Sequence, residues 1–208
     1  MNHSFHGRTM GALSVTGNPH YREAFEPGIG NIRFADLNDF DSVLACVNDK
    51  TCAILLETVQ GEGGIYPVQE DFLKKVRALC DEKDILLILD EIQCGMGRTG
   101  YWYAWQKYGI KPDIMTTAKA LAAVFRWVHF NDGKVGQHSL TAGDHGTTYG
   151  AIRWHVQLWQ RCWSCLKKTT FWSMCGRCRL IWKKSWDSLA AKYDFITDRR
   201  GMGLMQGL

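Results

Sequence analysis

The chain has 208 residues, a net charge of +4 and 46% hydrophobic residues. A chain of this length can bury a sizeable core in one or two domains. It has no signal-peptide pattern and no apolar run long enough to span a membrane. These features argue against secreted and membrane-spanning classes and predict a cytoplasmic protein.

Charge, tryptophan and cysteine are unevenly distributed. Residues 151–186 contain eight Lys and Arg and no acidic residue, and seven of the nine Trp lie within residues 122–186. Four cysteines are scattered singly, as reduced cysteines usually are, and four form two CxxC pairs: Cys46, Cys52, Cys80 and Cys94, then Cys162, Cys165, Cys175 and Cys178. Such asymmetry normally indicates an acidic partner.

The first 121 residues have the periodicities of a regular α/β protein. A helix is predicted near residues 37–47, with Asn38 or Asp36 as its N-cap, because apolar residues recur at helical spacing: Leu37, Phe40, Val43, Leu44 and Val47. Residues 52–57 form an apolar run of strand length.

A second helix and two further strands follow. The helix is predicted from one apolar face: Phe72, Leu73, Val76, Leu79 and Cys80. Residues 85–89 and 113–117 read as short buried strands. Strands that alternate with helices predict an α/β fold with a mostly parallel sheet and helices on both of its faces.

Polar side chains follow the ends of these strands. Asp90 and Lys119 each come just after a predicted strand, and Glu57 with the turn at residues 60–64 follows another. Ligands of parallel sheets bind beyond the carboxyl ends of the strands, so these groups are predicted to converge on one cleft.

A carboxylate and an amine at neighbouring strand ends suit a pyridoxal-phosphate enzyme. Such an enzyme needs a lysine for the Schiff base and an acid that keeps the pyridine nitrogen protonated. Lys119 fits the first task, because desolvation lets a buried amine lose its proton, and Asp90 fits the second. Spacing alone favours the simpler interpretation of a surface lysine and a helix-capping aspartate.

Five motifs in a fixed order favour the functional interpretation. They are residues 4–9 (SFHGRT), 60–64 (QGEGG), 90–93 with 95–100 (DEIQ and GMGRTG), 118–120 (AKA) and 145–150 (HGTTYG). In this order they resemble the class III aminotransferases of fold type I, and most closely the acetylornithine aminotransferases. The resemblance covers residues 3–121, 131–150 and 187–208.

The resemblance implies a role for each matching residue at the cofactor. Lys119 would bind pyridoxal phosphate covalently and then shuttle the substrate proton. Asp90 would pair with the pyridine nitrogen, and Gln93 would bond the ring hydroxyl. Ile92 would pack under the ring, and Phe5 would stack on its other face unless it is an ordinary core residue.

Three more residues acquire roles in the same way. Arg8 would bind a substrate carboxylate with its planar fork. Glu62 matches a glutamate near the distal amine of the substrate or its partner arginine, and Thr148 matches a threonine that reaches a phosphate across a dimer interface. Glu57 is interpreted as a residue that holds the strand end.

The implied reaction is a ping-pong transfer of an amino group between N-acetylornithine and 2-oxoglutarate in arginine synthesis, by a cytoplasmic homodimer. Ornithine or 4-aminobutyrate aminotransferase is the close alternative. An inactive, truncated remnant is the other alternative, because the family's phosphate loop and C-terminal arginine have no counterpart in the chain. Cys94 and Thr58 replace the Thr and Pro that are common in the family at these positions, and both replacements are expected to be compatible with the fold.

Two segments, residues 122–130 and 151–186, depart from the family pattern. Joining the last base of each codon to the first two of the next lets residues 122–130 be read as Gly-Gly-Val-Pro-Val-Gly-Ala-Phe, as in the family. A similar shift after Gly150 gives Asn-Pro-Leu-Ala-Cys-Ala and then an acidic amphipathic helix. The hypothesis is that both segments are out of frame.

A frame shift accounts for two other patterns and sets the predicted domains. The paired CxxC motifs resemble a zinc site, and the basic, Trp-rich stretch resembles a nucleic-acid surface. Both follow from the shift, so we predict no metal, nucleic acid or membrane partner.

Residues 1–186 are assigned to a partial cofactor-binding large domain and residues 187–208 to the start of a small domain. Misplaced Trp and Lys predict a weakly stable or inactive chain.

Overall fold

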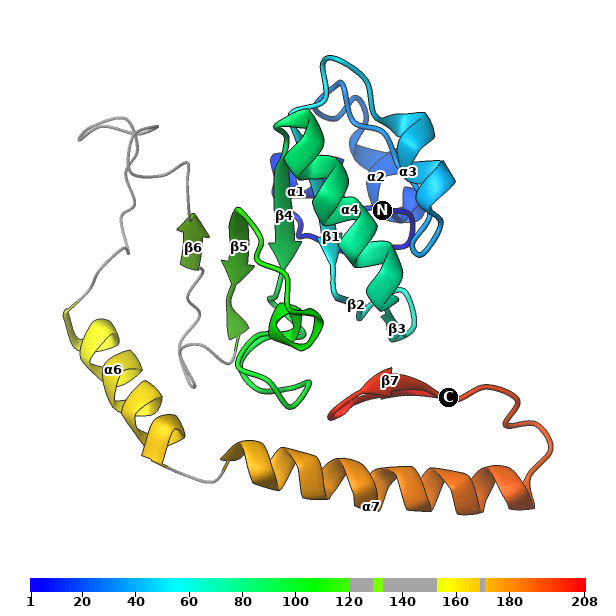
Figure 1. The fold of residues 1–208 in the computed structure, drawn as a ribbon, viewed down its shortest axis with the longest axis vertical. Helices are drawn as coiled ribbons and strands as arrows, with labels where there is room; N and C mark the ends of the chain where they lie inside the picture. The colour runs from blue at the N-terminus through cyan, green and yellow to red at the C-terminus, as the bar shows by residue number, and fades with distance from the viewer. Residues whose placement is uncertain (120–128, 133–152, 169–170) are drawn as a thin grey trace.

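The structure is a computed structural model, and it describes residues 1–119, 129–132, 153–168 and 171–208. Figure 1 shows strands near the centre with short helices above them and two long helices at the periphery. The elements in chain order are α1 (Met10–Ser14), α2 (Pro19–Arg22), η1 (Glu23–Phe25), α3 (Phe40–Cys46), β1 (Ala53–Glu57), β2 (Val59–Gln60), β3 (Tyr66–Pro67), α4 (Glu70–Lys83), β4 (Leu86–Asp90), η2 (Ala104–Tyr108), β5 (Ile114–Thr117), β6 (His129–Asp132), α6 (Arg153–Lys168), α7 (Phe171–Lys192), β7 (Arg200–Met202) and β8 (Met205–Gly207).

The main sheet has the strand order β1-β4-β5-β6. β1, β4 and β5 are parallel, and β6 runs antiparallel to β5. The predicted, mostly parallel sheet is therefore confirmed for the strands that the structure describes. The register pairs Asp90 with Glu57 on one side and with Thr116 on the other, so the carboxyl ends of three strands lie level with one another.

The core lies between this sheet and α4. All five residues of the predicted apolar face of α4 are buried, and Leu87 and Leu89 of β4 are fully inaccessible to solvent. Figure 1 shows α4 crossing in front of β1 and β4. Burial of each such leucine contributes about 1.5–3 kcal/mol, which makes the sheet a firm base for the residues at its carboxyl edge.

β4 begins and ends one residue later than predicted. Asp90 is its last residue, not the first residue of a loop, because its backbone still pairs with both neighbouring strands. The Asp90 side chain therefore leaves directly from the rigid sheet.

The predicted cap of the first longer helix was wrong. α3 begins after Asp39, whose carboxylate accepts a hydrogen bond from the Ser42 N–H at 3.0 Å. Asn38 does not cap this helix, because its side-chain oxygen accepts a hydrogen bond from the Gln69 N–H at 2.7 Å. Only Val43 of α3 is buried, and Leu44 is 44% exposed, so the helix covers less of the core than its periodicity predicted.

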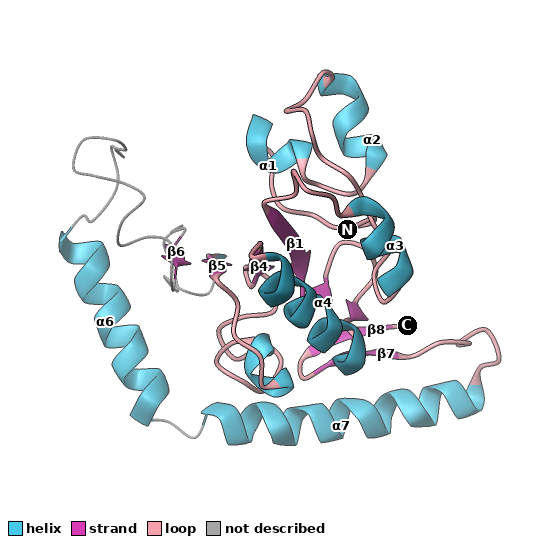
Figure 2. Cartoon of the chain, turned by 45° about the horizontal axis from the view of Figure 1, so that its top comes forward, coloured by secondary structure: helices cyan, strands magenta, loops and turns pink. Residues whose placement is uncertain are grey.

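Helix α6 and most of α7 fall in residues 151–186, the segment whose sequence departs from the family pattern. Figure 2 shows both as rods outside the cluster of strands and short helices. α7 leaves Leu180, Ile181 and Trp182 60%, 66% and 49% exposed, and the rings of Trp182 and Trp186 stack at 5.5 Å. The exposure is confined to part of the segment, because Cys175 of α7 is buried and Trp163 of α6 lies 4.4 Å from Trp102 between ring centroids.

α7 also runs through residues 186 and 187 without a break, and the predicted domain boundary at that point stays a prediction. No helix in the described part of the chain is long and apolar enough to cross a membrane.

Candidate functional site

The site is built at the carboxyl edge of β1, β4 and β5. Asp90 ends β4 and is 5% exposed. Lys119 lies two residues beyond the end of β5 and is exposed, so the predicted burial of its amine at the strand end was wrong. Its φ of 53° places it in the left-handed region, which is uncommon for residues other than glycine and is often found at functional sites. The structure thus brings the predicted carboxylate and amine to adjacent strand ends.

The Asp90 carboxylate is held at both oxygens. Oδ1 accepts a hydrogen bond from the Ile92 N–H at 3.0 Å, and Oδ2 lies 2.8 Å from Nδ1 of His6. His6 was part of the SFHGRT motif but received no role from the sequence. Its position in the motif between Phe5 and Arg8, which both have assigned roles, could have indicated a role for His6 as well.

Glu57 links two loops to the sheet. Its Oε1 accepts from the Phe5 N–H at 3.0 Å, and its Oε2 accepts from the Gly61 N–H at 3.2 Å. Burial raises the pKa of Glu57 to about 7, and ionised Asp90 also raises it, while the two N–H donors lower it. The contacts fit the interpretation of Glu57 as the residue that holds this strand end.

We expect the raised pKa of Glu57 to make stability depend on pH. A carboxyl whose pKa rises from 4.5 to about 7 on folding contributes stability that is complete below pH 4.5 and is lost as pH rises through about 7. The loss amounts to on the order of 3 kcal/mol. Urea unfolding across this interval tests this expectation. The fall in unfolding free energy with pH should become about half as steep in Glu57→Gln, because Glu91 has a similarly raised pKa, and an unfolding free energy that rises with pH contradicts it.

Phe5 and Arg8 form an aromatic and cationic cluster beside the strand ends. The Phe5 ring meets Tyr21 edge-on with centroids 5.8 Å apart, and the Arg8 guanidinium lies 4.5 Å from the Tyr21 ring centre. Phe5 is half-buried and Arg8 is exposed. A guanidinium held over an aromatic ring keeps N–H donors that can bind a carboxylate.

Gln93 and Glu62 lie on the turns that follow β4 and β2. A Cβ at Gly61 would lie 2.2 Å from the Gln93 Oε1, so the close approach of Gln93 depends on glycine at that position. Glu62 is exposed in the turn between β2 and β3, and Ile92 is half-buried. Thr148 lies outside the described residues, so its predicted role stays a prediction.

Glu91 is a buried carboxylate to which the sequence reasoning gave no role. Its oxygens accept from the backbone N–H groups of Ala104 at 3.0 Å and Trp105 at 2.9 Å. Thr58 and Cys94 also donate to it, which places the two family departures in one network. Burial raises the pKa of Glu91 to about 7. No local pattern reveals these contacts, because Ala104 and Trp105 are distant in sequence.

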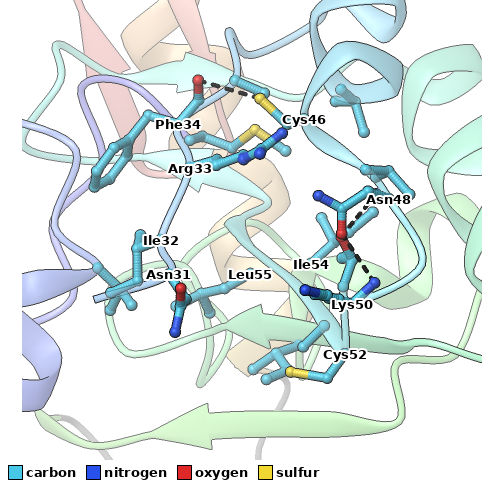
Figure 3. Close-up of a pocket in the computed structure, with 18 of the residues that line it drawn as sticks. Asn31, Ile32, Arg33, Phe34, Cys46, Asn48, Lys50, Cys52, Ile54 and Leu55 are labelled. Atoms are coloured by element: carbon cyan, nitrogen blue, oxygen red, sulfur yellow. Dashed lines mark hydrogen bonds between the residues drawn. The ribbon is translucent and has the colours of Figure 1, made fainter. Parts of the chain in front are cut away.

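A cavity lies away from this site. It has a volume of about 1010 Å³ and lies between β1 and two loops, with lining residues that include Phe34, Cys46, Lys50 and Ile54 (Figure 3). None of the predicted site residues lines it.

The eight cysteines are free. In the described ranges, no three His, Cys, Asp or Glu side chains gather closely enough to hold a metal ion.

Comparisons with known proteins agree on one family. A model of the family described as "Aminotransferase class-III" matches residues 1–208. The acetylornithine aminotransferase of Clostridium acetobutylicum is 42% identical over 216 residues, which cover 100% of this chain and 54% of that protein. The acetylornithine aminotransferase of Methanocaldococcus jannaschii is 39% identical, with coverage of 100% and 52%. The chain therefore spans about half the length of these relatives.

Solved structures confirm the predicted fold class. An ornithine aminotransferase from Toxoplasma gondii, described with partial occupancy of pyridoxal phosphate at its active site, superposes with a TM-score of 0.92 at 28% identity and covers 99% of this chain and 49% of its own. The N-acetylornithine aminotransferase of Stenotrophomonas maltophilia gives a TM-score of 0.73 at 31% identity, with coverage of 84% and 45%. Both have the fold type I architecture. Because the family model spans every residue and these relatives align along the chain, the protein belongs to the class-III aminotransferases.

Proposed function

We propose that this chain carries the central part of a pyridoxal-phosphate site for amino-group transfer. The observation that carries the proposal is the placement of Asp90 and Lys119 at the ends of adjacent parallel strands. Family membership and the cofactor in a structural relative support the same conclusion.

The side chains present fit pyridoxal phosphate. Asp90 is a buried carboxylate whose two oxygens each accept one hydrogen bond, so lone pairs remain for a protonated ring nitrogen. Lys119 offers an exposed amine on the adjacent strand end. When bound, the cofactor supplies an electron sink for the carbanion that forms at the substrate α-carbon.

Each residue then has a defined task. The Lys119 amine holds the cofactor and moves a proton at the substrate α-carbon. Asp90 keeps the ring nitrogen protonated, and Gln93 donates a hydrogen bond to the ring hydroxyl. Phe5 and Ile92 cover the two ring faces and exclude water from them.

The substrate contacts are assigned to charged groups at the edge of the site. Arg8 binds a carboxylate through its N–H edges, and Glu62 faces the distal end of the amino donor. Thr148 serves a phosphate of the neighbouring subunit, which requires a homodimer.

N-acetylornithine is the proposed amino donor and 2-oxoglutarate the acceptor, in arginine biosynthesis in the cytoplasm. The names of the curated relatives support this choice. Ornithine is the alternative donor, since a structural relative carries that name, and 4-aminobutyrate remains the third.

The chain as written can instead be an inactive remnant, and one observation favours this second candidate. The apolar side chains of α7 are exposed in the segment that departs from the family pattern. The proposed cause is the loss of reading frame in residues 122–130 and 151–186. Sequencing the coding DNA across codons 118–190 tests this cause. If the DNA encodes both segments in the reading frame of the family, the frame-shift hypothesis is wrong.

Amino transfer is tested with the purified full chain. Pyridoxal phosphate is added first, and N-acetylornithine, ornithine and 4-aminobutyrate are then compared as donors by formation of glutamate from 2-oxoglutarate. We expect N-acetylornithine to give the highest kcat/KM. Binding of the cofactor with no turnover supports the remnant, and absence of both contradicts the proposed site.

A further inference from the structure

His6 makes a close contact with Asp90 in the interior of the site. Nδ1 of His6 lies 2.8 Å from Oδ2 of Asp90, and the two side chains are only 4% and 6% exposed. The other ring nitrogen, Nε2, is buried and has no hydrogen-bond partner among the described residues. The ring therefore does not bridge two structural groups, and its polar interaction is directed at Asp90.

The backbone around His6 is fixed by buried hydrogen bonds. The His6 N–H donates to Oγ1 of Thr16 at 3.0 Å, and that hydroxyl donates to the Ala12 carbonyl at 3.0 Å. Ser4 accepts from the Gly17 N–H at 3.0 Å. Ser4 and Thr16 are fully buried, so the loop holds the imidazole at a set distance from the sheet.

The contact has a direct chemical use. Ile92 occupies one oxygen of Asp90, and a His6 Nδ1–H donor occupies the other. Two donors at fixed positions prevent rotation of the carboxylate, and they leave the remaining lone pairs to face the site. We propose that His6 is a positioning residue that orients Asp90 toward the ring nitrogen of pyridoxal phosphate, an inference that rests on the proposed function.

The test separates an effect on the ring nitrogen from a general loss of structure. The full chain and its variants are titrated with pyridoxal phosphate and with its carbocyclic analogue, in which C–H replaces the ring nitrogen. His6→Phe removes the donor, and His6→Asn retains an N–H near the position of Nδ1. His20→Asn is the matched control, because His20 is an exposed histidine that also contacts a carboxylate.

We expect His6→Phe to weaken binding of pyridoxal phosphate about tenfold or more, the effect of losing a hydrogen bond to a charged group. Binding of the analogue should stay the same, because it lacks the nitrogen that Asp90 contacts. His6→Asn should recover most of the affinity, and His20→Asn should match the unchanged chain. In an Asp90→Asn background, His6→Phe should have no further effect.

Three results overturn the inference. If His6→Phe weakens the binding of pyridoxal phosphate and of the analogue equally, His6 has a structural role only. If its affinity for pyridoxal phosphate is unchanged, His6 has no role at the ring nitrogen. If the Phe side chain prevents folding, His6→Ala repeats the comparison without added bulk. If the unchanged chain binds neither ligand, the proposed function fails together with this inference, and that outcome differs from a failure confined to the His6 variants.

Discussion

Replacing Lys119 by Ala should abolish the visible absorption band that forms when pyridoxal phosphate binds covalently to the chain. It should also lower amino transfer by about 10²–10⁴-fold or more, the usual contribution of a positioned acid–base group. The reason is that the proposed function gives one amine two tasks, covalent attachment and proton transfer. Absorbance titration measures the first task, and single-turnover formation of the keto acid measures the second.

A lysine outside the site provides the control for this experiment. Lys111 is exposed in the loop before β5, and Lys111→Ala should leave both readouts unchanged. Addition of a small amine to Lys119→Ala should restore some proton transfer, because the free amine can replace the missing base. A normal visible band in Lys119→Ala contradicts the assignment.

Replacing Glu91 by Ala should produce the largest loss of stability. The change leaves the backbone N–H groups of Ala104 and Trp105 buried without an acceptor. Each buried, unsatisfied donor costs about 1–3 kcal/mol, and the whole network should cost about 3–5 kcal/mol. A small domain is stable by about 5–15 kcal/mol, so the variant should unfold at a much lower urea concentration.

Glu82 is the matched control for Glu91, because it is an exposed carboxylate on α4. Glu82→Ala should change the unfolding free energy by no more than about 0.5 kcal/mol. An unfolding midpoint for Glu91→Ala equal to that of the unchanged chain means that water satisfies the two N–H groups. The buried network would then be unimportant for stability.

The elements that could be predicted are those whose cause is local. The helical spacing of apolar residues in α4 placed its buried face correctly, because burial follows the period of the helix. The apolar runs at β1, β4 and β5 gave the strands to within one residue at each end. Their carboxyl ends then placed Asp90 and Lys119 at one edge of the sheet.

The features that could not be predicted depend on distant partners. The capping error arose because Asn38 bonds the backbone of Gln69, which no local rule reveals. Two further sets of contacts form only when the chain has folded. They are the hydrogen bonds from the Ala104 and Trp105 N–H groups to Glu91, and the contact of His6 with Asp90. Sequence spacing therefore identified the groups at the site but not the contacts that hold them.

One carboxylate joins two loops that lie far apart in the chain. Because Glu57 accepts both the Phe5 and the Gly61 amide, neither loop can open alone without leaving a buried oxygen unpaired. The loop that carries Phe5 and the turn that carries Glu62 are thus anchored to the same side chain, and loss of the Glu57 carboxylate would release both. Under the roles proposed for Phe5 and Glu62, a change at Glu57 would therefore alter access to the ring face and access to the distal end of the substrate together.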